Sequence, residues 1–128
     1  MTYDVRKDWV KLMKSCLPKV YAIHPKNFDT VPCASYKELN NKDKADNFND
    51  NSFNPLNYDE VEYENTYWGK SITEVVNMIK AFDNAMVNEA IMFKKTYTSP
   101  DMYDGSFYYK VVRYKAIVDN YGNVYTGI

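Results

Sequence analysis

Three glutamates, Glu60, Glu62 and Glu64, are the residues whose type and spacing come closest to a chemical pattern. They recur at every second position, so an extended strand would place them on one face, roughly 7 Å apart. Paired carboxylates can act as general acid and base, but a row on an open strand has no pocket that raises one pKa. Two interpretations are left: a solvated sheet face, or an acidic surface that meets basic groups or faces a channel.

Basic residues on other predicted strands could match this acidic row. The match could form within the chain or between copies of it, because complementary charges fix the register of an interface. The candidate cations are Lys94, Lys110, Arg113 and Lys115.

No other spacing of residues indicates catalysis or metal binding. His24 is the only histidine and precedes a proline, which is typical of a loop residue. Asp43, Asp46 and Asp50 loosely resemble a cation-binding loop but lack its glycine and its closing glutamate. The chain has no phosphate-binding glycine loop and no nucleophile elbow. We therefore expect a protein that is not an enzyme and that has no metal and no cofactor.

Composition narrows the class of protein further. A net charge of −1 argues against bulk electrostatic binding of nucleic acid, although it leaves room for a local basic patch. No apolar run approaches the roughly 18 residues of a membrane span, and the first residues lack the apolar core of a signal peptide. Cys16 and Cys33 are isolated, so we expect reduced, mostly buried thiols. The 13 tyrosines favour surfaces at which proteins meet.

The acidic row must be positioned by strands around a central helix. Ser71 and Glu74 have the spacing of a capping box, in which the Glu74 carboxylate reaches back to the Ser71 N–H. An apolar stripe at helical spacing follows, and Asn88 is a plausible left-handed stop. The stripe consists of Ile72, Val75, Val76, Ile79, Phe82 and Met86.

Alternating residues predict strands on both sides of this helix. The segments 60–67 and 91–97 alternate apolar and polar residues, and 107–118 is rich in aromatic and β-branched residues. The turn-rich segment 99–106 joins the last two strands as an antiparallel hairpin.

The first third of the chain predicts one further helix and two short strands. Asp4 can cap a helix that ends before Pro18, and the segments 20–24 and 31–37 read as strands. The apolar stripe of this helix consists of Val5, Trp9, Leu12, Met13 and Cys16.

A tract rich in Asn, Asp, Lys and Ser covers about residues 40–57. Its composition predicts a long loop, but Phe48 and Phe53 lie within it. The tract is therefore either an ordinary surface loop or a segment that docks on a partner. The last residues, 119–128, predict a turn followed by an edge strand or arm.

This order of elements resembles the tail-completion or tail-terminator proteins of long-tailed bacteriophages. The likeness covers nearly the whole chain, although the long tract after Tyr36 departs from the family pattern. It is carried by Ile23, His24 and Pro25, by Val31 and Pro32 before a strand that ends at Tyr36, by residues 61–68 with the pair Tyr67 and Trp68, by the helix 72–88, and by the closing strand 107–119.

The resemblance implies a fold and a role. Together with the residue patterns it predicts a single α+β domain: a mostly antiparallel sheet of four to five strands with two helices packed on one face. It implies a homo-hexameric ring that ends the tail tube, with the tail-tube protein and a head-completion or connector protein as partners. Genomic DNA would pass through the lumen without sequence-specific binding, and the protein would reside in the virion after assembly in the host cytoplasm.

On this interpretation, the free sheet face and the 40–57 tract make subunit or tube contacts. The acidic row then pairs with a neighbour's cations or lines the lumen, where negative charge would repel DNA. Two alternatives stay open. One is another phage neck, head-completion or connector protein, and the other is a small soluble protein-binding module.

Overall fold

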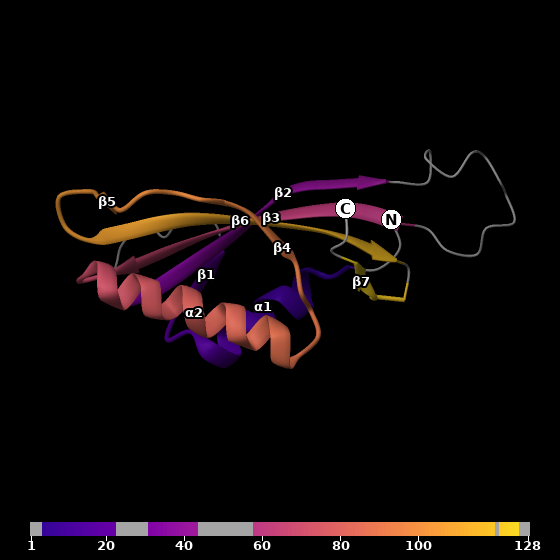
Figure 1. The fold of residues 1–128 in the computed structure, drawn as a ribbon, viewed down its shortest axis with the longest axis horizontal. Coiled ribbons are helices and arrows are strands. Elements are labelled where there is room, and N and C mark those ends of the chain that lie inside the picture. The colour runs from indigo at the N-terminus through magenta and orange to yellow at the C-terminus, as the bar shows by residue number, and fades with distance from the viewer. Residues whose placement is uncertain (1–3, 23–30, 44–57, 120, 126–128) are drawn as a thin grey trace, which may run out of the picture.

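The computed structural model describes residues 4–22, 31–43, 58–119 and 121–125. Within these ranges the chain forms two helices and seven strands, and all the strands belong to one sheet (Figure 1). In chain order the elements are α1 (Arg6–Cys16), β1 (Val20–Ala22), β2 (Cys33–Asp43), β3 (Tyr58–Gly69), α2 (Ile72–Asn88), β4 (Lys94–Thr98), β5 (Met102–Tyr103), β6 (Tyr108–Asp119) and β7 (Val124–Tyr125).

The fold is α+β, as predicted, but its sheet has seven strands within the described residues rather than the four to five expected. Its main path runs β1-β2-β3-β6-β4, and β5 and β7 each pair with β6. Only the β1–β2 pair is parallel; the other pairs among the described strands are antiparallel. Of the two short strands, β7 lies in the segment predicted as a C-terminal turn and edge strand, whereas β5, with two residues, is too short for alternation to be recognised in the sequence.

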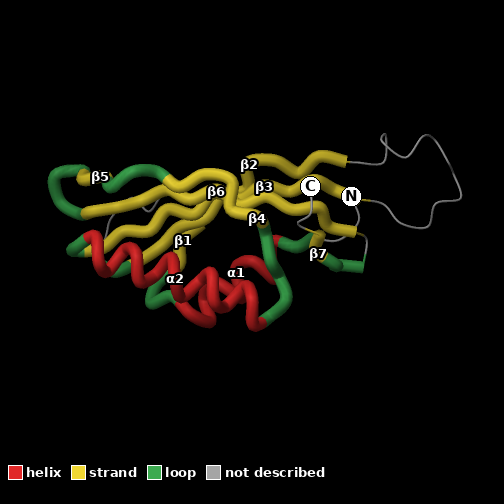
Figure 2. Tube along the Cα trace, in the orientation of Figure 1, coloured by secondary structure: helices red, strands yellow, loops and turns green. Residues whose placement is uncertain are grey.

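Both helices lie on the same side of the sheet (Figure 2). Along the long strands β3 and β6, every second side chain of the central part faces the helices and is buried. The buried residues on this side include Val61, Tyr63, Asn65, Tyr67, Val112, Tyr114, Ala116 and Val118. Thr66 and Trp68 of β3, which alternate with them, are buried as well. The opposite face of the sheet carries no helix in the described part of the chain.

The predicted helix 72–88 is confirmed, with two changes at its ends. The Ser71 hydroxyl accepts from the Glu74 N–H at 3.2 Å, but the Glu74 carboxylate accepts from the Lys70 N–H at 2.8 Å rather than from Ser71. The residue with left-handed backbone is Ala90, at φ 56°, and not Asn88. The chain therefore turns two residues later than the sequence predicted.

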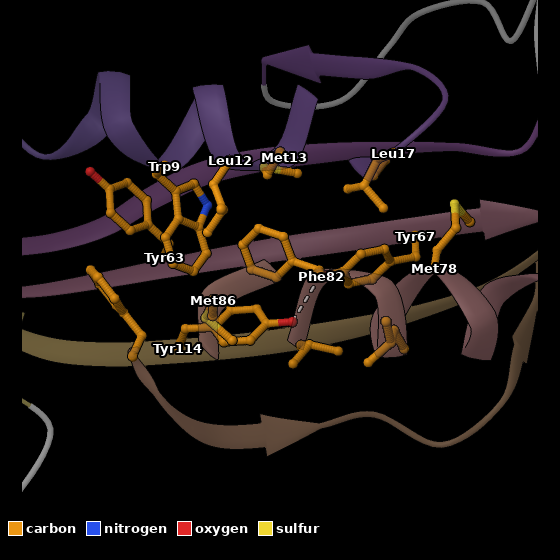
Figure 3. Close-up of a cluster of buried hydrophobic side chains, with 14 of the residues drawn as sticks. Trp9, Leu12, Met13, Leu17, Tyr63, Tyr67, Met78, Phe82, Met86 and Tyr114 are labelled. Atoms are coloured by element: carbon orange, nitrogen blue, oxygen red, sulfur yellow. Dashed lines mark hydrogen bonds between the residues drawn. The ribbon is translucent and has the colours of Figure 1, made fainter. Parts of the chain in front are cut away.

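Trp9 of α1 is buried in the core, where its ring contacts four other aromatic rings (Figure 3). Its ring stacks on Tyr63 at 4.9 Å and meets the edges of Phe82 at 4.9 Å and Tyr114 at 5.2 Å. Phe93 approaches it at 4.7 Å. Aromatic pairs at these separations add to the stabilisation that burial provides. One residue thus joins both helices to the two central strands.

A chain of hydrogen bonds crosses this apolar core. The Trp9 indole N–H donates to Asn65 Oδ1 at 3.1 Å, and Asn65 Nδ2 donates to the Tyr67 hydroxyl at 3.0 Å. The Tyr67 and Tyr114 hydroxyls lie 2.7 Å apart. Burial raises the pKa of both tyrosines, so both stay protonated at neutral pH. These bonds satisfy polar groups that would otherwise destabilise the core.

Strand β2 extends further than the sequence indicated. The predicted strand 31–37 continues to Asp43 through an irregularity between Glu38 and Asn40, and it pairs with β3 along its length. The loop predicted for 40–57 is therefore wrong for residues 40–43. Residues 44–57, with Phe48 and Phe53, lie outside the described residues, as does His24.

The last described residues form the predicted turn and edge strand. The Asp119 carboxylate accepts from the backbone N–H groups of Tyr121 and Asn123, from the Asn123 side chain and from the Tyr125 hydroxyl, at 2.8–3.0 Å. It thereby holds β7 against the end of β6.

Candidate functional site

The acidic row lies on the face of the sheet that carries no helix, which we call the open face. Glu60, Glu62 and Glu64 stand on β3, out of phase with Val61, Tyr63 and Tyr67, which face the helices. In the register of the sheet, Glu62 lies opposite Lys115 and Glu64 lies opposite Arg113, both on β6. The sheet therefore brings together the acidic and basic residues that the sequence proposed as a match.

Ion pairs within the chain neutralise most of this row. Glu64 lies between two cations, with Arg113 Nε at 2.9 Å and Lys37 Nζ at 3.5 Å. Glu60 pairs with Lys115 Nζ at 3.2 Å. The side chains of Glu64 and Glu60 are only 13% and 15% exposed, so the carboxylates are the more sheltered partners.

The remaining charges of the open face are unevenly placed. Glu62 and Lys94 have no ion pair within 4 Å among the residues that the structure describes. Lys94, on β4, lies opposite Lys115 and is exposed. Glu62 is half-buried in the middle of the row. Each is thus a charge that a neighbouring molecule could neutralise.

The described charges of the open face nearly cancel. Among the side chains that the structure describes, three carboxylates (Glu60, Glu62 and Glu64) face four cations (Lys37, Lys94, Arg113 and Lys115), a formal excess of one positive charge. The strand register adds Lys42 opposite Glu60. Partly exposed pairs of this kind contribute about 0–1 kcal/mol each. Their main effect is to order the side chains and to remove the strongly negative field that a row of carboxylates alone would create.

Two contributors to this surface were not among the residues singled out from the sequence. Lys37 reaches Glu64 because β2 flanks β3 on the other side from β6. The ring of Tyr97 lies 5.4 Å from the Arg113 guanidinium, a cation–π distance. Both residues could have been found only from the strand register, which the sequence does not fix here. Lys110, proposed as a match, pairs instead with Asp101 at 2.9 Å.

The cysteines stand apart from this surface. Cys16 and Cys33 are both free thiols, Cys33 buried and Cys16 half-buried. Burial raises the pKa of Cys33 to about 11, which makes its thiolate scarce at neutral pH.

No protein-family model and no curated protein matches this chain. Among the described residues, no group of three or more His, Cys, Asp or Glu side chains is placed to hold a metal ion. The two described helices are too short or too polar to cross a membrane.

Proposed function

We propose that this protein is a tail terminator of a long-tailed bacteriophage. In this role, identical copies form a ring at the head-proximal end of the tail tube, stop its polymerisation and present a surface to the head. The ring would be a hexamer with the tail-tube protein on one side and a head-completion or connector protein on the other. Genomic DNA would pass through its lumen without sequence-specific contacts.

The observation that carries the proposal is the open face of the sheet. Two helices cover one face of the sheet, whereas the other presents ordered, nearly neutral ion pairs with a tyrosine among them. Surfaces with paired charges and tyrosine are suited to specific protein contacts. A ring requires one contact between unlike surfaces of the same chain, repeated until it closes.

The order of the described elements also supports the proposal. The chain runs helix, short strand, proline-preceded strand, long strand, capped helix and hairpin, which is the order on which the resemblance to tail terminators rests. The near balance of charge changes one expectation. If the open face lines a lumen, DNA would pass a nearly neutral wall rather than a strongly negative one.

The test is to polymerise a purified phage tail-tube protein with and without this chain and to examine the tubes by electron microscopy. We expect shorter tubes with a ring-shaped density at one end only. A charge reversal of Glu62 to Lys, which leaves the ion pairs of Glu60 and Glu64 in place, tests the open face in the same assay. Tubes of unchanged length without end density would refute the proposal. Binding to filled heads but not to tubes would instead support a head-completion protein.

A further inference from the structure

A groove with excess positive charge lies between α1 and β2, on the helix-bearing side of the sheet. It has a volume of about 510 Å³. We call it the lysine groove, and its lining consists of Arg6, Lys7, Val10, Lys11, Lys14 and Tyr36, together with Asp4.

The lysines of this groove are available for a partner. Arg6 is held by Glu38 at 3.2 Å. In contrast, none of Lys7, Lys11 and Lys14 has an ion pair within the described part of the chain. Their spacing places them on one stripe of α1. Because the methylene stems of lysine are apolar, the groove offers an apolar surface beneath three ammonium groups.

The opposite edge of the sheet carries a projection of complementary chemistry. At the β5–β6 turn, the side chains of Met102, Tyr103 and Tyr108 are exposed, and we call these residues the aromatic tip. Tyr103 is 58% exposed, and its ring lies 4.7 Å from that of Tyr108. Figure 1 shows β5 at one extreme end of the molecule.

Carboxylates flank the aromatic tip and fix its shape. Asp104 accepts from the N–H groups of Ser106 and Phe107, both at 2.8 Å, and these bonds lower its pKa, so it stays ionised. Asp101 is exposed beside Lys110. A turn already held in one conformation loses little entropy when it binds.

We propose that the aromatic tip of one copy docks in the lysine groove of the next copy. The inference rests on the proposed ring and names the contact that would build it. Ammonium groups over the tyrosine faces provide cation–π attraction, and Asp104 meets the lysine stripe. The tip extends from the β4–β6 edge, whereas the groove adjoins β2 near the β1 edge. The contact therefore joins unlike surfaces and propagates from copy to copy.

Cross-linking tests this pairing directly. In a Cys16→Ser chain, Val10→Cys in the groove is combined with Ser106→Cys beside the tip, so that Lys11 and Tyr103 are kept, and the chain is treated with a short bis-maleimide; Cys33 is buried and reacts slowly. We expect a ladder of covalent multimers larger than dimers. The matched control combines Val10→Cys with Tyr121→Cys, since Tyr121 is 68% exposed but lies beyond the end of β6 that is far from the tip. A ladder no stronger than that of the control, from a chain that still assembles, would overturn the contact.

Assembly energetics give a second, independent readout. Lys11→Glu should raise the midpoint concentration of assembly at least tenfold, whereas Lys80→Glu, on the exposed side of α2, should change it less than twofold. Equal shifts for the two variants would overturn the proposal. So would unchanged assembly of Lys11→Glu with weakened binding of a DNA duplex, which would assign the groove to nucleic acid. A natural chain that stays monomeric at every concentration would refute the ring as well; assembly without the cross-link would refute only this contact.

Discussion

The buried hydrogen-bond chain predicts an asymmetry between two tyrosines that look alike in the sequence. Tyr67→Phe removes the acceptor of Asn65 Nδ2 and the partner of the Tyr114 hydroxyl, which leaves two buried polar groups unsatisfied. At about 1–3 kcal/mol for each such group, the loss of unfolding free energy should be about 2–6 kcal/mol. Tyr114→Phe removes only the last hydroxyl of the hydrogen-bond series, because Tyr67 still accepts from Asn65. It should lower the free energy of unfolding by about 1 kcal/mol.

The double variant sharpens this prediction. Once Tyr67 is Phe, removing the Tyr114 hydroxyl also removes an unsatisfied group, so the double variant should cost less than the sum of the single ones by about 1 kcal/mol or more. Urea unfolding, followed by circular dichroism, measures the free energy of unfolding of the natural chain, the two single variants and the double variant. All four are compared at one protein concentration that is too low for assembly. Tyr97→Phe is the control, since its ring is exposed on the open face; it should change stability by less than about 0.5 kcal/mol. Equal, additive losses for Tyr67→Phe and Tyr114→Phe would refute the reasoning.

Three further predictions concern the turn, the helix cap and the open face. Burial opposes ionisation of Asp119, but the hydrogen bonds that its carboxylate accepts outweigh burial and lower its pKa. The ionised carboxylate therefore stabilises the fold above the ordinary pKa of about 3.9, and this stabilisation is lost as pH falls through the lowered pKa. Asp119→Asn should therefore be less stable at pH 7, and thermal melts should show the gap closing in strong acid; a gap independent of pH contradicts this. Ser71→Ala should cost about 1 kcal/mol by removing the cap of α2, with Ser106→Ala as an exposed control, and an unchanged melting temperature would exclude the cap. Glu64→Gln should cost up to about 1 kcal/mol at low salt and less at high salt, whereas Glu62→Gln should cost little; equal effects would show that the pairs of Glu64 contribute nothing.

The elements with a clear period were predictable from the sequence. Helix α2 has an apolar stripe and a capping serine, and β3 and β6 alternate over enough residues to identify their buried faces. Strand β2 was predicted too short because residues 40–43 are Asn, Asn, Lys and Asp, which have weak strand preference. Pairing with β3 holds them in the sheet, and such a tertiary cause leaves no local pattern.

The candidate site was predictable in its residue types but not in its arrangement. The period of the three glutamates placed them correctly on one face, and Arg113 and Lys115 were correctly named as candidate partners. The ion pair of Lys37 with Glu64 and that of Lys110 with Asp101 depend on strand order and register. The lysine groove depends on α1 lying beside Tyr36, and no spacing within either segment indicates that contact.

The central claim is that copies of this chain close into a ring through one repeated contact. Native mass spectrometry of the purified natural chain over a wide range of concentrations tests it most directly. We predict a single closed species of six copies that gains population as concentration rises, without longer open series. A chain that stays monomeric at every concentration, or that forms only dimers, would contradict the account.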